Sequence, residues 1–205
     1  MKITGTDKLK KLAARVRTVP AAAERAMHRA INTTAVKVQT MAVKDITSQL
    51  SLKSSYVRGL FSIRKASASR MEAFVVARVR PVRLFRFNPR QLTAFASRAR
   101  GDKRRGIPAE FKHAGMSVQV SPENGRKTMK RAFILPLRAG TEAAGNGWGI
   151  FVRTGKGAAD VKHLYGPSPD QVFRRWRREQ ALSVSRMLAQ AYASQLRYEL
   201  TGKRN

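Results

Sequence analysis

Two acids and a lysine are the residues in this sequence whose spacing comes nearest to that of a catalytic site. Asp102 precedes the tripeptide Glu110-Phe111-Lys112, and in one class of metal-dependent nucleases such acids hold Mg²⁺ while the lysine orients water. The basic neighbours Lys103, Arg104 and Arg105 instead predict local ion pairing for Asp102. The 12 acidic residues are spread singly along the chain. Because acid–base and two-metal chemistry needs converging carboxylates, the sequence favours a protein that is not an enzyme.

Other residue types that support catalysis or metal binding are scarce. Cysteine is absent, which excludes thiolate catalysis, zinc–cysteine sites and disulfides. His28, His113 and His163 lie far apart and lack the i,i+4 spacing of a helical metal pair. The Gly-rich stretches 145–149 and 155–157 contain no P-loop string, so we expect flexible turns there, with a phosphate-binding nest as the alternative. We therefore expect no metal and no cofactor.

The dominant property of the sequence is its positive charge. Lys and Arg number 42 against 12 Asp and Glu, which gives a formal net charge of +30. Self-repulsion of this size destabilises a compact monomer, so we expect a polyanion or an acidic protein surface as the partner. The candidate contact residues form three clusters: Lys8, Lys10, Lys11, Arg15 and Arg17; Arg98, Arg100, Lys103, Arg104 and Arg105; and Arg174, Arg175, Arg177 and Arg178.

These three clusters have two interpretations. They are either solvated faces or surfaces that bind phosphates and carboxylates, for which the planar arginine fork is suited. On DNA they would contact the backbone without reading its sequence. A free, sequence-independent nucleic-acid-binding protein is therefore one hypothesis, and a nuclease that uses Asp102, Glu110 and Lys112 is another.

Helices are expected at both ends of the chain. Residues 7–17 predict a short basic helix, and Pro20 suits the first turn of a longer helix that continues to about Gln49. Near the other end, Ser168 is a natural N-cap for a basic helix that begins at Pro169 and ends near Leu200. The small-residue face of the N-terminal helix is predicted to carry Ala23, Met27, Ala30, Thr34, Val38 and Met41.

The middle of the chain has the pattern of strands. Residues 51–58 predict a turn and a short helix with Ser51 as N-cap, and strands are expected at 61–63, 71–80, 82–87, 116–120, 130–137 and 148–153. Few crossovers long enough for parallel pairing separate them, which favours an antiparallel or mixed sheet. Strands bracketed by helices indicate the α+β class, with a central sheet between a long N-terminal and a long basic C-terminal helix.

We expect one domain over residues 1–205. It would consist of an N-terminal helical region at 1–50, a strand-rich middle at 60–155 and the C-terminal helix at 168–201. No run approaches the ~20 apolar residues that a membrane span requires, and the first residues lack the apolar stretch of a secretory signal. We therefore expect no membrane partner.

One stretch of the sequence carries a family resemblance. An aromatic-rich strand begins at Trp148 and ends at Arg153, a Gly-Lys turn follows, and the string Leu164-Tyr165-Gly166-Pro167-Ser168 precedes the C-terminal helix. This pattern resembles the minor tail protein Z family of tailed phages, whose members are also called tail completion proteins. Residues 51–58 and 63–66 and the order of helix, strands and helix are similar to the family as well.

The string 164–168 also has a purely local interpretation. Leu164 and Tyr165 can anchor a loop in the core, and Gly166 permits a positive φ. Pro167 stiffens the chain and Ser168 caps the helix. We therefore expect a rigid strand-to-helix joint. The further interpretation is that the joint, together with Trp148 and Arg153, forms a contact between subunits.

The resemblance implies a structural virion protein with no catalytic residues. Such a protein would lie at the head–tail junction, or neck, and complete the tail so that it can join the DNA-filled head. A closed ring is implied, and the six-fold symmetry of the tail suggests a hexamer. The implied partners are the tail terminator, the tail tube and the connector or portal-side proteins of the head, with the phage DNA end as a further candidate. The implied location is the virion tail or neck, after assembly in the host cytoplasm.

Overall fold

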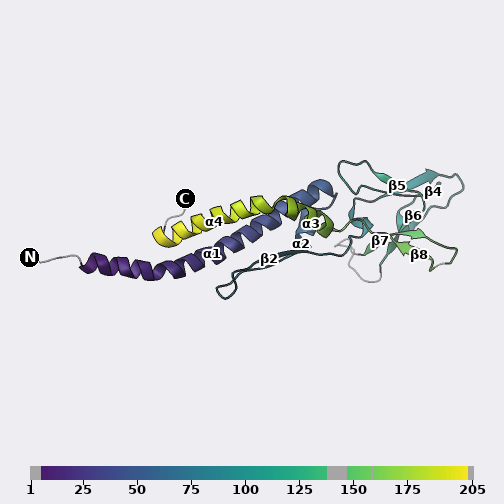
Figure 1. Cartoon of the computed structure of the whole chain (residues 1–205). Coiled ribbons are helices and arrows are strands. Elements are labelled where there is room, and N and C mark those ends of the chain that lie inside the picture. The colour runs from purple at the N-terminus through teal and green to yellow at the C-terminus, as the bar shows by residue number, and fades with distance from the viewer. Residues whose placement is uncertain (1–5, 138–146, 158, 203–205) are drawn as a thin grey trace, which may run out of the picture. The chain divides into compact units, whose positions relative to one another are not determined.

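The computed structural model describes residues 6–137, 147–157 and 159–202, and within them all side chains except those of residues 6–19 and 104 (Figure 1). The chain divides into two compact units. Unit 1 takes Met1–Ala42, Phe61–Ala77 and Arg175–Asn205, and unit 2 takes Val43–Leu60 and Arg78–Arg174. The single domain over residues 1–205 stays a prediction.

The α+β class is confirmed, with every strand pair antiparallel. The helices are α1 (Thr6–Gln49), α2 (Ser54–Gly59), α3 (Pro169–Glu179) and α4 (Ala181–Thr201), with 3₁₀ turns η1 (Leu84–Arg86) and η2 (Lys103–Arg105). The strands are β1 (Phe61–Arg64), β2 (Phe74–Ala77), β3 (Arg90–Phe95), β4 (Phe111–Val118), β5 (Lys127–Met129), β6 (Ala132–Pro136), β7 (Trp148–Arg153) and β8 (Val161–His163).

The described strands form three small sheets, where the sequence predicted one central sheet. Their orders are β1-β2, β3-β4-β5 and β6-β7-β8. Most of these strands are short, and consecutive strands pair with each other, so each hairpin closes before the next begins. The predicted strand 148–153 is confirmed to the residue as β7, whereas β3, β5 and β8 were not predicted.

Unit 1 is built on the pairing of α1 with α4 (Figure 1). Ala22, Ala26 and Ala30 are buried at four-residue steps, and small side chains on such a face let another helix approach closely. Ala23 and Met27 of the predicted face are only half buried, so the buried stripe lies one residue earlier in this part of α1. Ala30 and Thr34 are buried as predicted.

Polar contacts fix the other parts of unit 1 to α1. Arg25 Nε donates to Glu199 Oε2 at 2.9 Å, and Arg29 pairs with the other oxygen of the same carboxylate. The amide of Asn32 donates to the carbonyl of Ala66 at 3.0 Å and its side-chain oxygen accepts from the Ala66 N–H at 2.8 Å. This two-way contact ties the turn after β1 to α1.

Three predicted helix boundaries need correction. The two expected N-terminal helices are one continuous helix, α1, with Pro20 inside it. A proline removes one backbone hydrogen bond and crowds the preceding turn, but the helix continues through it here. The expected C-terminal helix is two helices, α3 and α4, separated at Gln180. The residue before α2 is Lys53 and not Ser51, whose N–H instead donates to the Val120 carbonyl at 2.9 Å.

Unit 2 has its own core. Val57 of α2, Met116 of β4 and Ile150 of β7 are fully buried, as is Phe87 just after η1. Residues 82–87 were predicted as a strand, but Leu84–Arg86 form a 3₁₀ turn closed by the Phe87 N–H to Leu84 carbonyl bond of 3.1 Å. The two buried residues of this turn, Leu84 and Phe87, are three positions apart, which fits a 3₁₀ period and not a strand period of two.

Candidate functional site

The string Leu164–Ser168 pairs with a segment far away in the sequence. The Gly166 N–H donates to the Val82 carbonyl at 2.7 Å, and the Leu84 N–H donates to the Leu164 carbonyl at 3.1 Å. The Ser168 hydroxyl donates to the Val79 carbonyl at 2.8 Å and accepts a weaker bond of 3.3 Å from the Asp170 N–H. The predicted Ser168 cap is present, while the rigidity of the joint and a subunit contact there stay predictions.

Two details of the predicted joint are wrong. Gly166 does not have a positive φ. It is needed for space, because a Cβ at this position would lie 2.4 Å from the ring of buried Phe87. Tyr165 is not anchored in the core, since it is 51% exposed. Leu164 is half buried, and Ser168 is buried as a cap should be.

The segment held by this joint is rich in arginine and lines a pocket. Arg78, Arg80, Arg83 and Arg86 surround a cavity of about 790 Å³ within unit 2. The other polar lining residues are Ser55 and Tyr56 of α2 and Tyr165 of the joint. The Arg86 guanidinium lies 4.4 Å from the centre of the Tyr56 ring, a cation–π contact that orients both side chains. None of the described lining residues is acidic, so the pocket concentrates positive charge.

The electrostatic effect of this pocket reaches a neighbouring histidine. His163 stacks on Phe151 with ring centres 4.6 Å apart and contacts Tyr165 with ring centres 4.5 Å apart. Burial lowers the pKa of His163, and the positive charge of Arg83 lowers it further. His163 therefore packs between two aromatic rings.

The predicted cluster at residues 98–105 lies on an ordered loop of the same unit. The Asp102 N–H donates to the Ile107 carbonyl at 2.8 Å, and the Glu110 N–H donates to the Ala99 carbonyl at 2.8 Å. Arg98, Arg100 and Lys103 are exposed on this loop, whereas the side chain of Arg104 lies outside the described residues. Arg105 is half buried, pairs with Asp102 at 3.4 Å and lies over the Phe133 ring.

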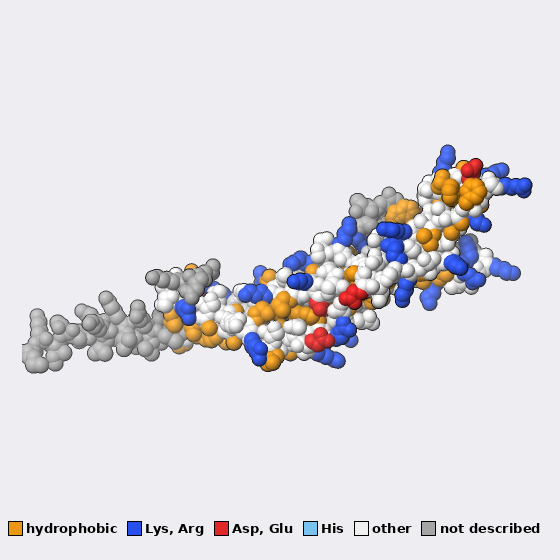
Figure 2. Space-filling view, turned by 90° about the horizontal axis from the view of Figure 1, so that it is seen from above, with side chains coloured by type: hydrophobic (Ala, Val, Ile, Leu, Met, Phe, Trp, Pro, Cys, Tyr) orange, Lys and Arg blue, Asp and Glu red, His pale blue; other side chains and the backbone are white. Residues whose placement is uncertain are grey.

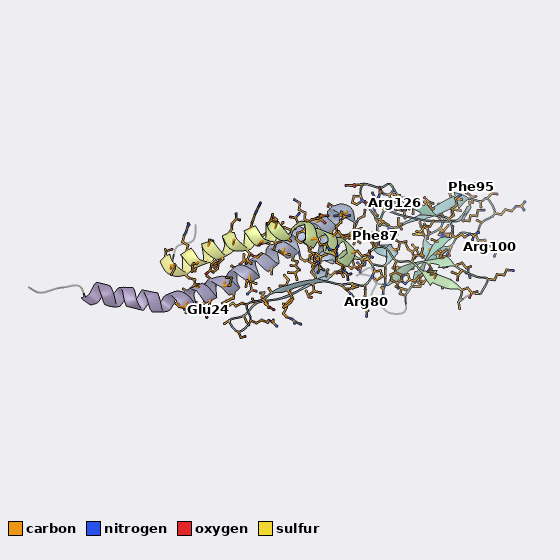
Figure 3. All side chains as sticks on the ribbon, in the orientation of Figure 1. Glu24, Arg80, Phe87, Phe95, Arg100 and Arg126 are labelled. Atoms are coloured by element: carbon orange, nitrogen blue, oxygen red, sulfur yellow. The ribbon has the colours of Figure 1, made fainter. Side chains whose placement is uncertain are left out.

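An exposed aromatic side chain accompanies this loop. Phe95, which ends β3, is 66% exposed and makes an edge contact with Phe111. Phe95 and Arg100 lie at the same end of the strand-rich region, and Arg80 of the pocket lies well away from them (Figure 3). Unit 2 therefore carries two separate basic regions, only one of which was predicted.

The predicted arginine cluster on α3 is partly paired with acidic residues of the same helix. On α3, Arg177 and Arg178 are exposed, while Arg174 pairs with Asp170 at 2.8 Å and Arg175 approaches Glu179 at 3.9 Å. The Arg175–Glu179 pair is exposed on both sides and contributes little stability, whereas Asp170 in the other pair is buried. The side chains of Lys8, Lys10, Lys11, Arg15 and Arg17 lie outside the described residues. Figure 2 shows Lys and Arg spread over the visible face with few Asp and Glu among them.

The second Gly-rich stretch is a turn closed by its own side chains. The Gly157 N–H donates to the Asp160 carboxylate at 2.8 Å, and Arg153 donates to the Gly157 carbonyl at 2.9 Å. A nest that bound phosphate would need such N–H groups for the ligand, and here a carboxylate of the chain takes this one. The turn interpretation therefore holds for residues 155–157, and Gly145 lies outside the described residues.

The residues of the nuclease hypothesis do not form a metal site. Asp102 is paired with Arg105, and Glu110 and Lys112 are both exposed. Among the residues that the structure describes, no group of three or more His, Asp or Glu side chains lies close enough to hold a metal ion.

The described helices also contain no apolar stretch of the length that crossing a bilayer needs.

Sequence reasoning missed the pocket arginines. Arg78, Arg80, Arg83 and Arg86 are spaced through a segment interpreted as strand, so they did not form a run like those at 98–105 or 174–178. The available signal was the interruption of that segment by Pro81, which prevents a regular ladder on both sides of it. The long-range pairing with residues 164–168 could not be read from a single sequence.

These features define a strongly basic α+β protein whose surface and pocket are rich in arginine. The chain belongs to the prophage minor tail protein Z family, whose model matches residues 7–204. The resemblance noted at residues 148–169 is thereby confirmed, and the protein is a structural component of the phage tail. No curated protein and no solved structure matched the chain.

Proposed function

We propose that this tail protein acts at the head–tail junction, where it completes the tail and allows it to join the DNA-filled head. The observation that carries the proposal is the family match over residues 7–204. The basic surfaces are consistent with it, because a junction protein meets both the DNA end and the rims of neighbouring ring proteins. We further propose that the protein is located in the neck of the virion after assembly in the host cytoplasm.

The proposed assembly is a closed ring, and the tail symmetry suggests six subunits. Ring closure lets many modest contacts between copies add up to one stable object. Support comes from apolar side chains of α4 that unit 1 does not bury. No residue of α4 is fully buried, and Leu182 and Leu200 are 66% and 53% exposed. Such side chains gain stability when a neighbouring subunit covers them. Native mass spectrometry of the protein bound to purified tails measures the number of copies.

Removal of the protein from the phage tests the junction role. A phage that lacks the protein should produce filled heads and finished tails that remain separate, and a plasmid copy of the gene should restore joined particles. Electron microscopy of the lysate counts the two kinds of particle. Joined, infective particles formed without the protein would sink the proposal.

The basic loop is tested in the same complementation assay. Replacing Arg98, Arg100 and Lys103 with Ala should leave the protein folded and reduce the yield of joined particles, because these exposed side chains are proposed to contact acidic partners. The matched control replaces exposed Arg64, Lys65 and Arg70 with Ala, which removes the same charge from the β1–β2 hairpin. Equal yields of joined particles for the two variants would show that the loop has no specific role in joining heads to tails.

Sequence-independent binding of nucleic acid is the second candidate function. The observation that favours it is the pairing of exposed Phe95 with the basic loop, because an exposed ring can stack on a base while arginines hold phosphates. A labelled single strand should then bind more tightly than a duplex, and Phe95→Ala should remove this difference. If Phe95→Ala leaves both affinities unchanged, the ring has no role in binding.

A further inference from the structure

We propose that the pocket lined by Arg78, Arg80, Arg83, Arg86, Tyr56 and Tyr165 binds an acidic peptide segment of another protein. The proposal rests on the proposed function only in taking that protein to be a virion neighbour. The pocket itself is defined within unit 2 and stands on its own residues.

The first argument is the density of arginine around one hollow. Arg78, Arg80, Arg83 and Arg86 line a cavity of about 790 Å³, and none of the described lining residues is acidic. Cavities of about 300–1,000 Å³ are the usual size for compact ligands. Arginine binds carboxylates with two parallel hydrogen bonds, which gives geometric selectivity as well as charge. An anionic ligand of limited size therefore fits the site.

The second argument is that the pocket is prepared before any ligand arrives. Main-chain bonds from Gly166 to Val82 and from Leu84 to Leu164 hold the backbone of the arginine segment against the joint. The Ser168 hydroxyl fixes the Val79 carbonyl at the same edge. Because the backbone is already ordered, a ligand need not order it, and less binding energy is lost on association.

The third argument separates a peptide from nucleic acid. A duplex presents a broad convex row of phosphates, whereas these arginines line a recess. Base stacking needs open aromatic faces, but Arg86 covers one face of the Tyr56 ring, and the ring of His163 packs against that of Tyr165. Leu60 and Pro81 add apolar lining between the charges. Carboxylates alternating with apolar side chains match this lining better than phosphates and bases do.

The fourth argument identifies the ligand as part of a different protein. The 12 acidic residues of this chain are spread singly, and no stretch of it combines several carboxylates. A second copy of the chain therefore has no acidic segment to insert. The occupant must come from a partner with clustered Asp and Glu.

The test measures binding of a labelled peptide of alternating Glu, Asp and Leu to the full-length protein by fluorescence anisotropy. The pocket variant carries Arg78→Ala and Arg80→Ala, both at exposed positions, and the matched control carries Arg64→Ala and Arg70→Ala, which are exposed on the β1–β2 hairpin. The two variants have the same net charge. Loss of two charge-assisted contacts should weaken binding about tenfold or more in the pocket variant, with a change of about twofold or less in the control.

Each other outcome overturns the proposal. An equal loss in both variants would mean that only net charge matters. If the acidic peptide does not bind, acidic peptides are excluded as ligands of the pocket. The same holds if a peptide with Gln and Asn in place of Glu and Asp binds equally well. If an oligonucleotide bound and only the pocket variant lost it, the pocket would be a nucleic-acid site. Circular dichroism confirms that each variant is folded.

This experiment separates the proposal from the junction role. Peptide binding is measured on purified protein, so it can hold even if heads and tails join without the protein. Conversely, a protein required for joining can fail to bind the peptide. The two results are therefore independent of each other.

Discussion

At the residue scale, Gly166 links the family string to the core of unit 2. Its N–H donates to Val82, while the buried Phe87 ring occupies the place that a side chain would take. Two demands therefore act on one position: close approach of two backbones and room for an aromatic ring. Neither demand involves a special φ angle, which is why reasoning from backbone freedom alone gave the wrong explanation.

Gly166→Ala should destabilise unit 2. The added Cβ would overlap the ring of Phe87, which is fully buried, so we expect a loss of about 1–3 kcal/mol in the free energy of unfolding. Urea denaturation measures it. Gly125→Ala is the control, because nothing lies within 4 Å of a Cβ there. Equal stabilities of the two variants would contradict the packing role.

His163 predicts a pH dependence at the same scale. Burial and Arg83 hold its pKa below the ordinary value of 6.5, so the folded protein binds this proton less readily than the unfolded chain does. The contribution of His163 to stability is therefore complete above about pH 6.5 and is lost as the pH falls below that value. An NMR titration should show the depressed pKa, and Arg83→Gln should raise it part of the way. No change on that substitution would exclude a role for the Arg83 charge.

At the element scale, α3 and α1 show what sequence patterns can and cannot give. The start of α3 was predictable because Ser168 and Pro169 are strong local signals for the start of a helix. The end of α4 was predictable because glycine commonly follows the last turn of a helix, and Gly202 does adopt the left-handed conformation there, with φ of 70°. The break at Gln180 was not predictable, since no Gly or Pro marks it. The helical period also placed the buried face of α1 one residue away from its true position over Ala22 and Ala26.

Trp176→Ala should destabilise unit 1. Trp176 is only 5% exposed on α3, so its removal leaves a large cavity and should cost about 3–5 kcal/mol in the free energy of unfolding. Leu182→Ala on α4 is the matched control, because that side chain is 66% exposed and its loss should change stability by about 0.5 kcal/mol or less. Chemical denaturation measures the free energy of unfolding of both variants. It is followed by far-UV circular dichroism, because that signal does not rely on the fluorescence of the removed tryptophan. An unchanged midpoint for Trp176→Ala would mean that its burial contributes nothing.

The candidate site was predictable only in part, for reasons that belong to this scale. Arg98, Arg100 and Lys103 were found because clustered charges in a Gly-containing loop are visible in the sequence and loops lie at the surface. The pocket arginines were missed because their position depends on pairing between residues 79–84 and 164–168. Such contacts depend on tertiary packing and leave no local pattern.

At the scale of the whole molecule, the net charge of +30 should govern binding to any polyanion. If DNA contacts about 6–10 of the basic side chains, its affinity should fall about 10³- to 10⁵-fold between 50 and 200 mM salt, because each contact releases counterions. Replacing Arg98, Arg100 and Lys103 with Ala should reduce the slope of log affinity against log salt by about 2–3. If a DNA duplex does not bind at 50 mM salt, DNA is excluded as a partner, and the basic side chains can contact only proteins.

The joint between residues 79–84 and 164–168 has a consequence for the order of folding during synthesis. The arginine segment is made early, but the residues that fix its backbone leave the ribosome much later, about 80–90 positions further along the chain. Until then the segment that carries the four arginines lacks these bonds to residues 164–168. Every nascent chain that stops short of Ser168 therefore lacks the full set of bonds that holds this segment, and the pocket is assembled only after residues 164–168 have been made.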